Sequence, residues 1–140
     1  MINIEEKSEE IFIVLKKYIL ANSKYNPEVK KVSKNIKYPS VIFEEMTNSL
    51  DSVSCDDYQI QEFRNLDFEI TIYAVDQGNI NSTIICNELA NLVIQIMQRC
   101  YRMQGGLDAK LFNINESQAT QYTLHFSCKW FMQKNILFSE

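Results

Sequence analysis

The segment from Phe63 to Val75 is the strongest strand signal in the chain. Every second position carries an apolar residue: Leu66, Phe68, Ile70, Ile72 and Ala74. The positions between them are Asp67, Glu69, Thr71, Tyr73 and Val75. Successive side chains of a strand point to opposite faces of its sheet. The segment therefore predicts a strand with one fully apolar face, and with a second face that becomes apolar only at Tyr73 and Val75.

Three further segments have strand patterns. In residues 120–132 one face would hold Tyr122, Leu124, Phe126, Cys128 and Trp130. Aromatic residues that alternate along a strand favour a core packed against a helix, with a subunit interface as the alternative. Residues 107–115 alternate more weakly, and residues 116–118 suit a turn. Val41 to Phe43 follows Pro39 and predicts a short strand. The polar residues 47–58 predict a loop.

Two segments predict helices. In residues 4–21 apolar residues recur at helical spacing: Ile4, Ile11, Val14, Leu15, Tyr18 and Ile19. In residues 80–103 an apolar stripe contains Ile85, Leu89, Leu92, Val93, Ile96, Met97 and Cys100. Asn81 or Ser82 can cap this second helix, and Gly105-Gly106 would break it.

The predicted order of elements is α-β-β-α-β-β. This order favours an α+β fold in which the helices pack on one face of a mixed or antiparallel sheet of about four strands. The chain has 140 residues and only three glycines and two prolines. That length suits one domain, 1–140, with its own hydrophobic core.

The charge and hydropathy patterns argue against several classes of protein. The net charge is −4, whereas a domain that coats nucleic acid needs a basic face. No window reaches the ~18–20 apolar residues of a membrane span. The N-terminal sequence MINIEEKSEE is acidic, unlike a signal peptide. We therefore expect a cytoplasmic protein that binds neither membranes nor specific nucleic acid.

The sequence contains no recognisable catalytic, metal or cofactor site. His125 is the only histidine and lies in the middle of a predicted strand. The four cysteines, Cys55, Cys86, Cys100 and Cys128, lack the close spacing of a zinc site and are expected to be structural. No glycine-rich phosphate loop is present. We therefore expect a protein that is not an enzyme and that holds no cofactor or metal.

Two neighbouring stretches of the chain carry opposite charge. Residues 24–37 are rich in lysine, and residues 44–62 are rich in carboxylates. A solvated loop is the simplest interpretation of the first stretch, and a basic contact for an acidic surface is the alternative. The candidate contacts with a neighbouring subunit or a tube are Lys30, Lys31, Lys34, Lys37, Glu44, Glu45, Asp56, Asp57, Glu62 and Tyr73.

Several of these segments together resemble a known family. They are the opening helix, the sequence YPSVIFEE at 38–45, FRNLDFEITIYA at 63–74, the helix that holds Glu88-Leu89, and YTLHFSCKW at 122–130. This string is similar to the tail terminator, or tail completion, proteins of phages and prophages, which also occur in phage tail-like bacteriocins. The resemblance covers most of residues 5–132 and includes no catalytic signature.

The resemblance implies a structural protein of virion assembly. Its subunits would form a homo-oligomeric ring, expected to be a hexamer, on the last ring of a tail tube. The ring would end polymerisation of the tube protein and offer a surface to neck or cap proteins. In a contractile particle, the sheath would be a further partner. The protein would then leave the cell within a virion or tail-like particle on lysis. The alternative is a non-catalytic adaptor or small-ligand-binding α+β module.

Overall fold

The protein has an α+β fold, described here by a computed structural model of residues 4–31, 34, 37–55, 60–114, 117–131 and 136–138. Its elements in chain order are α1 (Ile4–Asn22), β1 (Glu28–Lys30), β2 (Ser40–Cys55), β3 (Ile60–Val75), α2 (Ser82–Ile94), the π-helix η1 (Gln95–Cys100), β4 (Gln104–Ile114), β5 (Ser117–Phe131) and β6 (Ile136–Phe138). The predicted fold class is confirmed, and the short strands β1 and β6 are additions that the sequence pattern did not predict.

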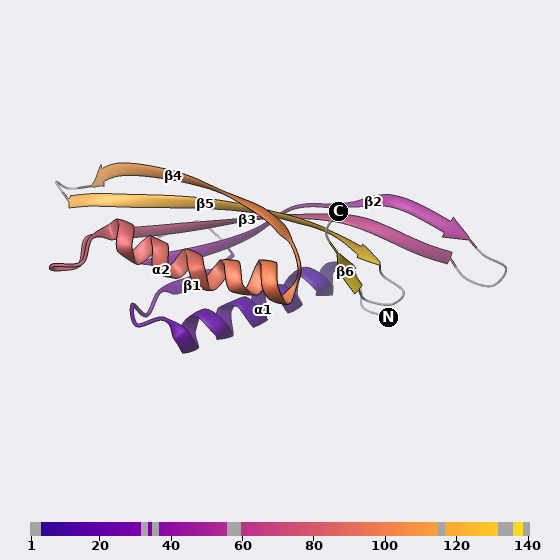
Figure 1. The fold of residues 1–140 in the computed structure, drawn as a ribbon, viewed down its shortest axis with the longest axis horizontal. Coiled ribbons are helices and arrows are strands. Elements are labelled where there is room, and N and C mark those ends of the chain that lie inside the picture. The colour runs from indigo at the N-terminus through magenta and orange to yellow at the C-terminus, as the bar shows by residue number, and fades with distance from the viewer. Residues whose placement is uncertain are drawn as a thin grey trace.

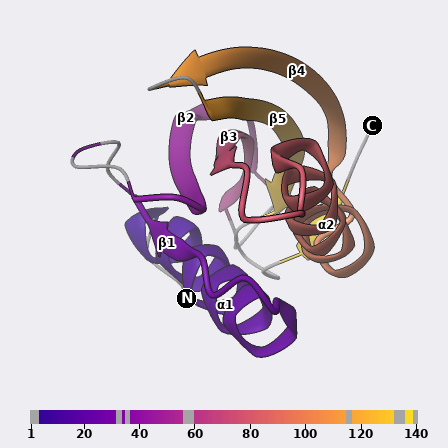
Figure 2. The same ribbon diagram turned by 90° about the vertical axis from the view of Figure 1, so that its left-hand side faces the viewer.

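The strands form one mixed sheet in the order β1-β2-β3-β5-β4, with β6 beside β5. β1 and β2 are parallel, and all other neighbours are antiparallel. Figures 1 and 2 show that the sheet curves over α1 and α2, which lie on the same side of it. The two helices therefore cover one face of the sheet, as predicted, and we call the opposite side the outer face.

The core lies between the sheet and the two helices. The apolar positions of β3, from Leu66 to Ala74, are all buried, and so are those of β5, from Tyr122 to Trp130. The register places Ile70 opposite Leu124, so the two apolar faces continue across the sheet. The predicted core faces of both strands are thus confirmed, because burial on one face imposes the period of two.

The loop predicted at residues 47–58 is wrong over most of its length. β2 continues to Cys55, which pairs with Ile60 at the far end of a long hairpin with β3. The register shifts between Glu45 and Thr47 and again between Leu50 and Ser52, which is the signature of bulges. Backbone hydrogen bonds to β3 form whatever the side chains are, so a polar sequence can continue a strand. Residues 56–58 lie outside the described residues.

The second helix ends earlier than predicted. Its α-helical part stops at Ile94, and Gln95–Cys100 forms a π-helix, in which hydrogen bonds span five residues. The wider turn rotates later residues away from the apolar stripe, so Cys100 is exposed. Gly105 and Gly106 lie within β4 and do not break the helix. At the other end Asn81 is the cap, since its Oδ1 accepts a hydrogen bond from the Thr83 N–H at 2.8 Å.

Smaller corrections concern the first helix and the ends of the strands. Val14 is exposed although it was predicted on the apolar stripe of α1, while Ile11, Leu15 and Ile19 are buried as expected. β4 begins at Gln104. β5 begins at Ser117, within the predicted turn 116–118. The connection predicted at 24–37 contains β1, whose Val29 joins the core.

Candidate functional site

The outer face of the sheet is the surface that the two helices leave uncovered. Its side chains are those that alternate with the core residues of β2, β3 and β5. One cross-strand row contains Glu44, Glu69 and His125, and the next contains Thr47, Asp67 and Ser127. These six side chains are exposed or half-buried. The outer face is therefore a polar surface that carries more carboxylates than cations in these two rows.

A shallow hollow of about 550 Å³ crosses this face. It adjoins a second hollow of about 360 Å³, and both are lined by Thr47, Asp67, Gln104 and Ser127, one residue from each of four strands. The Thr47 hydroxyl donates a hydrogen bond to the Asp67 carboxylate. Thr47, Gln104 and Ser127 are all exposed. A ligand here would stay in contact with solvent, unlike the deeply enclosed ligands of most small-molecule sites.

His125 lies at the edge of this hollow and makes one weak polar contact. Its Nδ1 lies 3.9 Å from Glu69 Oε2, beyond hydrogen-bond distance. The imidazole is also 61% exposed, so solvent screens the pair. Among the described residues no hydrogen bond joins His125 to Thr123 or to Ser127, the two hydroxyl residues that flank it on the same face of β5. The arrangement lacks the base-to-nucleophile contact that covalent catalysis uses.

The part of the chain that the structure describes contains no group of three or more histidine, cysteine, aspartate or glutamate residues arranged to hold a metal ion. Two of the cysteines are buried among apolar neighbours. Burial raises the pKa of Cys86 to about 12. The pKa of Cys128 is also raised to about 12, mainly by burial. The charge of Lys7 lowers this pKa, and the charge of Asp67 raises it. Thiols held in the protonated form are poor nucleophiles and poor metal ligands.

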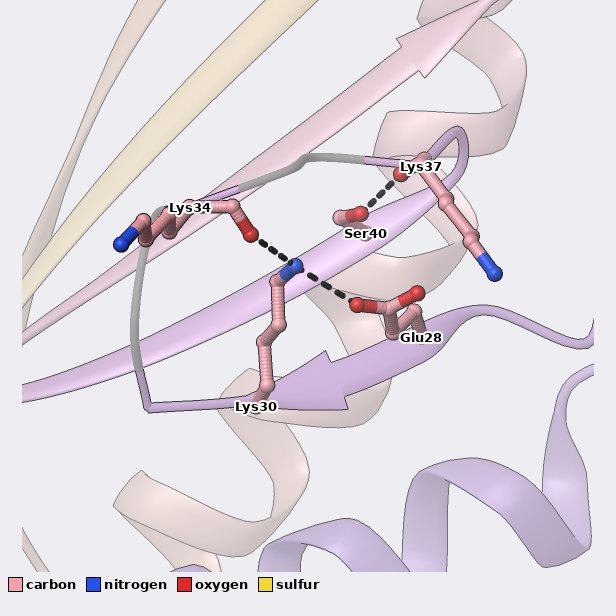
Figure 3. A network of polar contacts seen from close by, with 5 residues as sticks. All are labelled: Glu28, Lys30, Lys34, Lys37 and Ser40. Carbon is pink, nitrogen blue, oxygen red and sulfur yellow. Dashed lines mark hydrogen bonds and ion pairs between the residues drawn. The ribbon is translucent and has the colours of Figure 1, made fainter.

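The lysines of residues 30–37, which we call the lysine segment, fall into two groups. Lys30 Nζ lies 2.6 Å from Glu28 Oε1 and donates a hydrogen bond of 2.7 Å to the Lys34 carbonyl. Figure 3 shows this ammonium group between the strand and the segment that follows it. The hydrogen bond that Lys30 donates to the Glu28 carboxylate lowers the pKa of Glu28. Lys30 thus ties the segment to β1.

The other lysines of the segment differ in their surroundings. Lys31 forms an ion pair with Glu9 of α1. The carbonyl of Lys37 accepts a hydrogen bond from the Ser40 hydroxyl, whereas its ammonium group points away from this network, as does that of Lys34 (Figure 3). Lys34 and Lys37 are both exposed. Of the four candidate lysines, these two have no ion pair among the described residues, whereas Lys30 and Lys31 each have one.

Three of the five acidic candidates lie on the β2–β3 hairpin. Glu44 and Glu45 are exposed on β2. Glu62 lies on β3, where its backbone pairs with Val53. Asp56 and Asp57 lie outside the described residues. The structure therefore places Glu44, Glu45 and Glu62 on the two strands of one hairpin.

Tyr73 lies on the outer face of β3, opposite the first residue of β2. It is half-buried and pairs with Ser40 of β2. Burial raises its pKa, and the nearby Tyr38, Glu44 and Glu69 raise it further. Two of the candidate residues, Tyr73 and Glu44, therefore lie in each other's electrostatic field.

Sequence reasoning missed the residues that line the hollow. The alternating pattern placed Asp67 and Ser127 on polar faces, but only the register of the sheet brings them side by side. Thr47 was assigned to a loop, and Gln104 to no helix or strand. Because such a site combines four strands, no local signal in the sequence identifies it.

Comparison with known proteins adds no relative: no protein-family model and no curated protein matches the sequence. In the described parts of the chain, none of the helices has both the length and the apolar character needed to cross a membrane.

Proposed function

We propose that the chain is a subunit of a ring that caps the head-proximal end of a phage or phage-like tail tube. The proposal starts from the segments that resemble tail terminator proteins. The architecture supports it, because a ring subunit needs surfaces on two sides for its neighbours and does not need an enclosed pocket. The ring would end polymerisation of the tube and present a surface to neck or cap proteins.

The observation that carries this proposal is a sheet with open edges on opposite sides. On one side, β1 pairs with β2 only from Ser40 to Ile42, so within the described residues the rest of β2 has an open edge. On the other side, β4 pairs with β5 and forms the opposite edge of the sheet. Open edges accept strands from other chains. Edges on opposite sides suit head-to-tail contacts, which close into rings when the rotation between subunits allows it.

Deletion of the gene in a host that makes the particles tests the proposal. Electron microscopy of the released particles would measure the length of their tails. Without a terminator we expect tubes that are over-long or that lack a neck or cap, and a plasmid-borne wild-type copy should restore a uniform length. Tails of normal length, with normal ends, in the deletion strain would contradict the proposed function.

The hollow on the outer face supports a second candidate, a non-catalytic adaptor or small-ligand-binding module. Its volume of about 550 Å³ falls within the range of ligand pockets. A thermal-shift screen of metabolites against the wild type and the variant Asp67→Asn would test it. This candidate predicts a compound that stabilises the wild type more than the variant. Neighbouring genes for metabolic enzymes, in place of tube, sheath or portal genes, would also favour it.

A further inference from the structure

Three of the five large apolar side chains that are exposed among the described residues lie on α1. They are Ile13, Val14 and Leu20, and 38–45% of the surface of each is exposed. Ile13 and Leu20 are seven residues apart and therefore lie on the same face of the helix. Figures 1 and 2 show the sheet and α2 on one side of α1 and no described element on the other. This uncovered side, which we call the free face of α1, is a candidate contact surface.

The charges on the free face change sign along the helix. Glu9 and Glu10 precede Ile13, and Lys16 and Lys17 follow it. With about 3.6 residues in each turn, Glu9 and Lys16 flank Ile13 on one side. Glu10 and Lys17 flank it on the other side. The free face is therefore acidic at one end and basic at the other, with an apolar side chain between the two ends.

All four charged side chains are accessible. Lys16 and Lys17 are exposed, and no ion pair of either is found among the described residues. Glu9 and Glu10 each pair with one lysine of their own chain, but their side chains remain 50% and 42% exposed. A carboxylate has two oxygens and can accept hydrogen bonds from more than one ammonium group. The glutamates can therefore contact a second molecule as well.

The free face is complementary to a second copy of itself. Two α1 helices laid antiparallel, with a two-fold axis beside Ile13, bring Ile13 against its own copy. The same arrangement brings Glu9 close to Lys16 of the second copy and Glu10 close to Lys17 of the second copy. Each pair occurs twice by symmetry, so four ion pairs surround the apolar centre.

Other arrangements of the two helices bring like charges together. In a parallel pair every residue lies beside its own copy, so carboxylates face carboxylates and lysines face lysines. An antiparallel pair that places Ile13 against Leu20 of the second copy has its axis between Lys16 and Lys17, and four ammonium groups then meet. Complementary charges select against both alternatives.

We propose that α1 pairs with α1 of a second copy, antiparallel and centred on Ile13, in a symmetric dimer. The inference goes beyond the proposed function and does not rest on it, because the contact uses neither edge of the sheet. One helix from each copy forms a smaller interface than a standard complex has. We therefore expect a weak dimer, with a dissociation constant on the order of 100 µM.

Exchange of the charges tests the contact. One variant carries Lys16→Glu and Lys17→Glu, and a second carries Glu9→Lys and Glu10→Lys. Sedimentation equilibrium at low salt would measure the association of the wild type, of each variant and of an equimolar mixture. Each variant has a free face of one sign and should associate more weakly by on the order of tenfold or more. The mixture should recover association, and so should a chain with all four changes, because its free face is again complementary to itself.

A matched control makes the same change of net charge outside α1. Lys34→Glu with Lys37→Glu alters two exposed lysines and should leave the dimer unchanged. Circular dichroism would establish that each variant is folded.

Cysteine cross-linking tests the register and does not depend on the glutamate variants. In a background of Cys55→Ser and Cys100→Ser, the further change Ile13→Cys should give a disulfide-linked dimer under mild oxidation. The two copies of residue 13 meet at the axis, where the Cα separation of about 4–7 Å that a disulfide requires can be reached. Leu20→Cys is the matched control on the same face. It should not cross-link, because seven residues on each side of the axis separate its two copies by about 20 Å.

Three results would overturn the contact. They are a wild type that stays monomeric at low salt up to about 1 mM, a mixture of the two charge variants that does not recover association, and Leu20→Cys that cross-links as fast as Ile13→Cys. The last result would indicate a parallel pair or random collisions. The particle experiment remains separate, because tail length does not depend on whether α1 pairs in solution.

Discussion

The aromatic ring of Phe126 on β5 packs against the backbone of Gly105 on the neighbouring strand β4. A Cβ atom added to Gly105 would lie 2.6 Å from Phe126 Cε1 and 2.9 Å from the carbonyl oxygen of His125. Both distances are far below van der Waals contact. Phe126 is itself buried in the core. The absence of a side chain at Gly105 is therefore what allows β4 to pair closely with β5 at this point.

Gly105→Ala should destabilise the protein for this reason. The added methyl group must displace a buried ring and a backbone carbonyl, and overpacking of this kind costs about 1–3 kcal/mol. Urea unfolding followed by circular dichroism would measure the change. The double variant Gly105→Ala with Phe126→Leu serves as the control, because the smaller side chain leaves room for the methyl group. If Gly105→Ala destabilises the Phe126→Leu protein as much as it destabilises the wild type, this explanation is wrong.

Ser82 and Thr120 join α2 to β5 through a buried hydrogen bond. Their hydroxyl oxygens lie 2.8 Å apart, and both residues are fully buried. Thr120→Val keeps the shape of the side chain but leaves the Ser82 hydroxyl without this partner, which should cost about 1–3 kcal/mol. The double variant Ser82→Ala with Thr120→Val should lose less than the sum of the two single changes. Additive losses, measured by chemical unfolding, would show that the two hydroxyls do not interact.

The buried thiols should make the protein less stable at alkaline pH. The folded state raises the pKa of Cys86 and of Cys128 from 9.0 to about 12. Their contribution is fully present below about pH 9, where the unfolded thiols are also protonated. It is lost as pH rises towards 12, because only the unfolded state then releases the protons. The free energy of unfolding should fall by up to about 1.4 kcal/mol per pH unit for each thiol in this window.

Unfolding of the wild type and of Cys86→Ala between pH 8 and 11 would measure this effect. The variant is expected to show a shallower fall above pH 9, because one of the two protons is no longer involved. Cys100→Ala removes an exposed thiol and provides the matched control. Equal slopes for the wild type and Cys86→Ala would refute a role for that thiol in the pH dependence.

Lys30 should control how tightly the lysine segment is held. Its ammonium group contacts both Glu28 and the carbonyl of Lys34. Lys30→Ala removes both contacts, and we expect trypsin to cleave after Lys34 and Lys37 severalfold faster because the segment opens more often. Global stability should change by about 1 kcal/mol or less, since the ion pair is partly exposed. The control variant Lys24→Ala, outside the segment, should leave the cleavage rates unchanged. If Lys30→Ala also left them unchanged, the contacts of Lys30 would not hold the segment in place.

The core of the fold could be predicted because local sequence reports burial directly. Leu66 to Ala74 in β3 and Tyr122 to Trp130 in β5 alternate without interruption, and each set lies on one buried face. The apolar stripe of α2 identified the helix in the same way. Its continuation to Cys100 was wrong, because η1 changes the number of residues in each turn and local spacing does not reveal that change.

The candidate surfaces were predictable only in part. The charges of 24–37 and 44–62 are visible in the sequence, but the sequence does not show that Lys30 and Lys31 are held by Glu28 and Glu9. It also gave no indication that Thr47 lies in a strand. Partners such as Glu9 and Lys31 are separated by 22 positions in the chain, so only the folded chain brings them together.

The sequence by itself determined the buried faces of β3 and β5, the α+β class, and the separation of positive from negative charge. Each of these follows from side-chain chemistry at neighbouring positions. The tertiary structure alone decided how far β2 extends, which polar residues share the outer hollow, and which lysines form ion pairs within the chain. The physical reason is that strand pairing depends on backbone hydrogen bonds between distant segments, and local side-chain patterns do not specify those bonds.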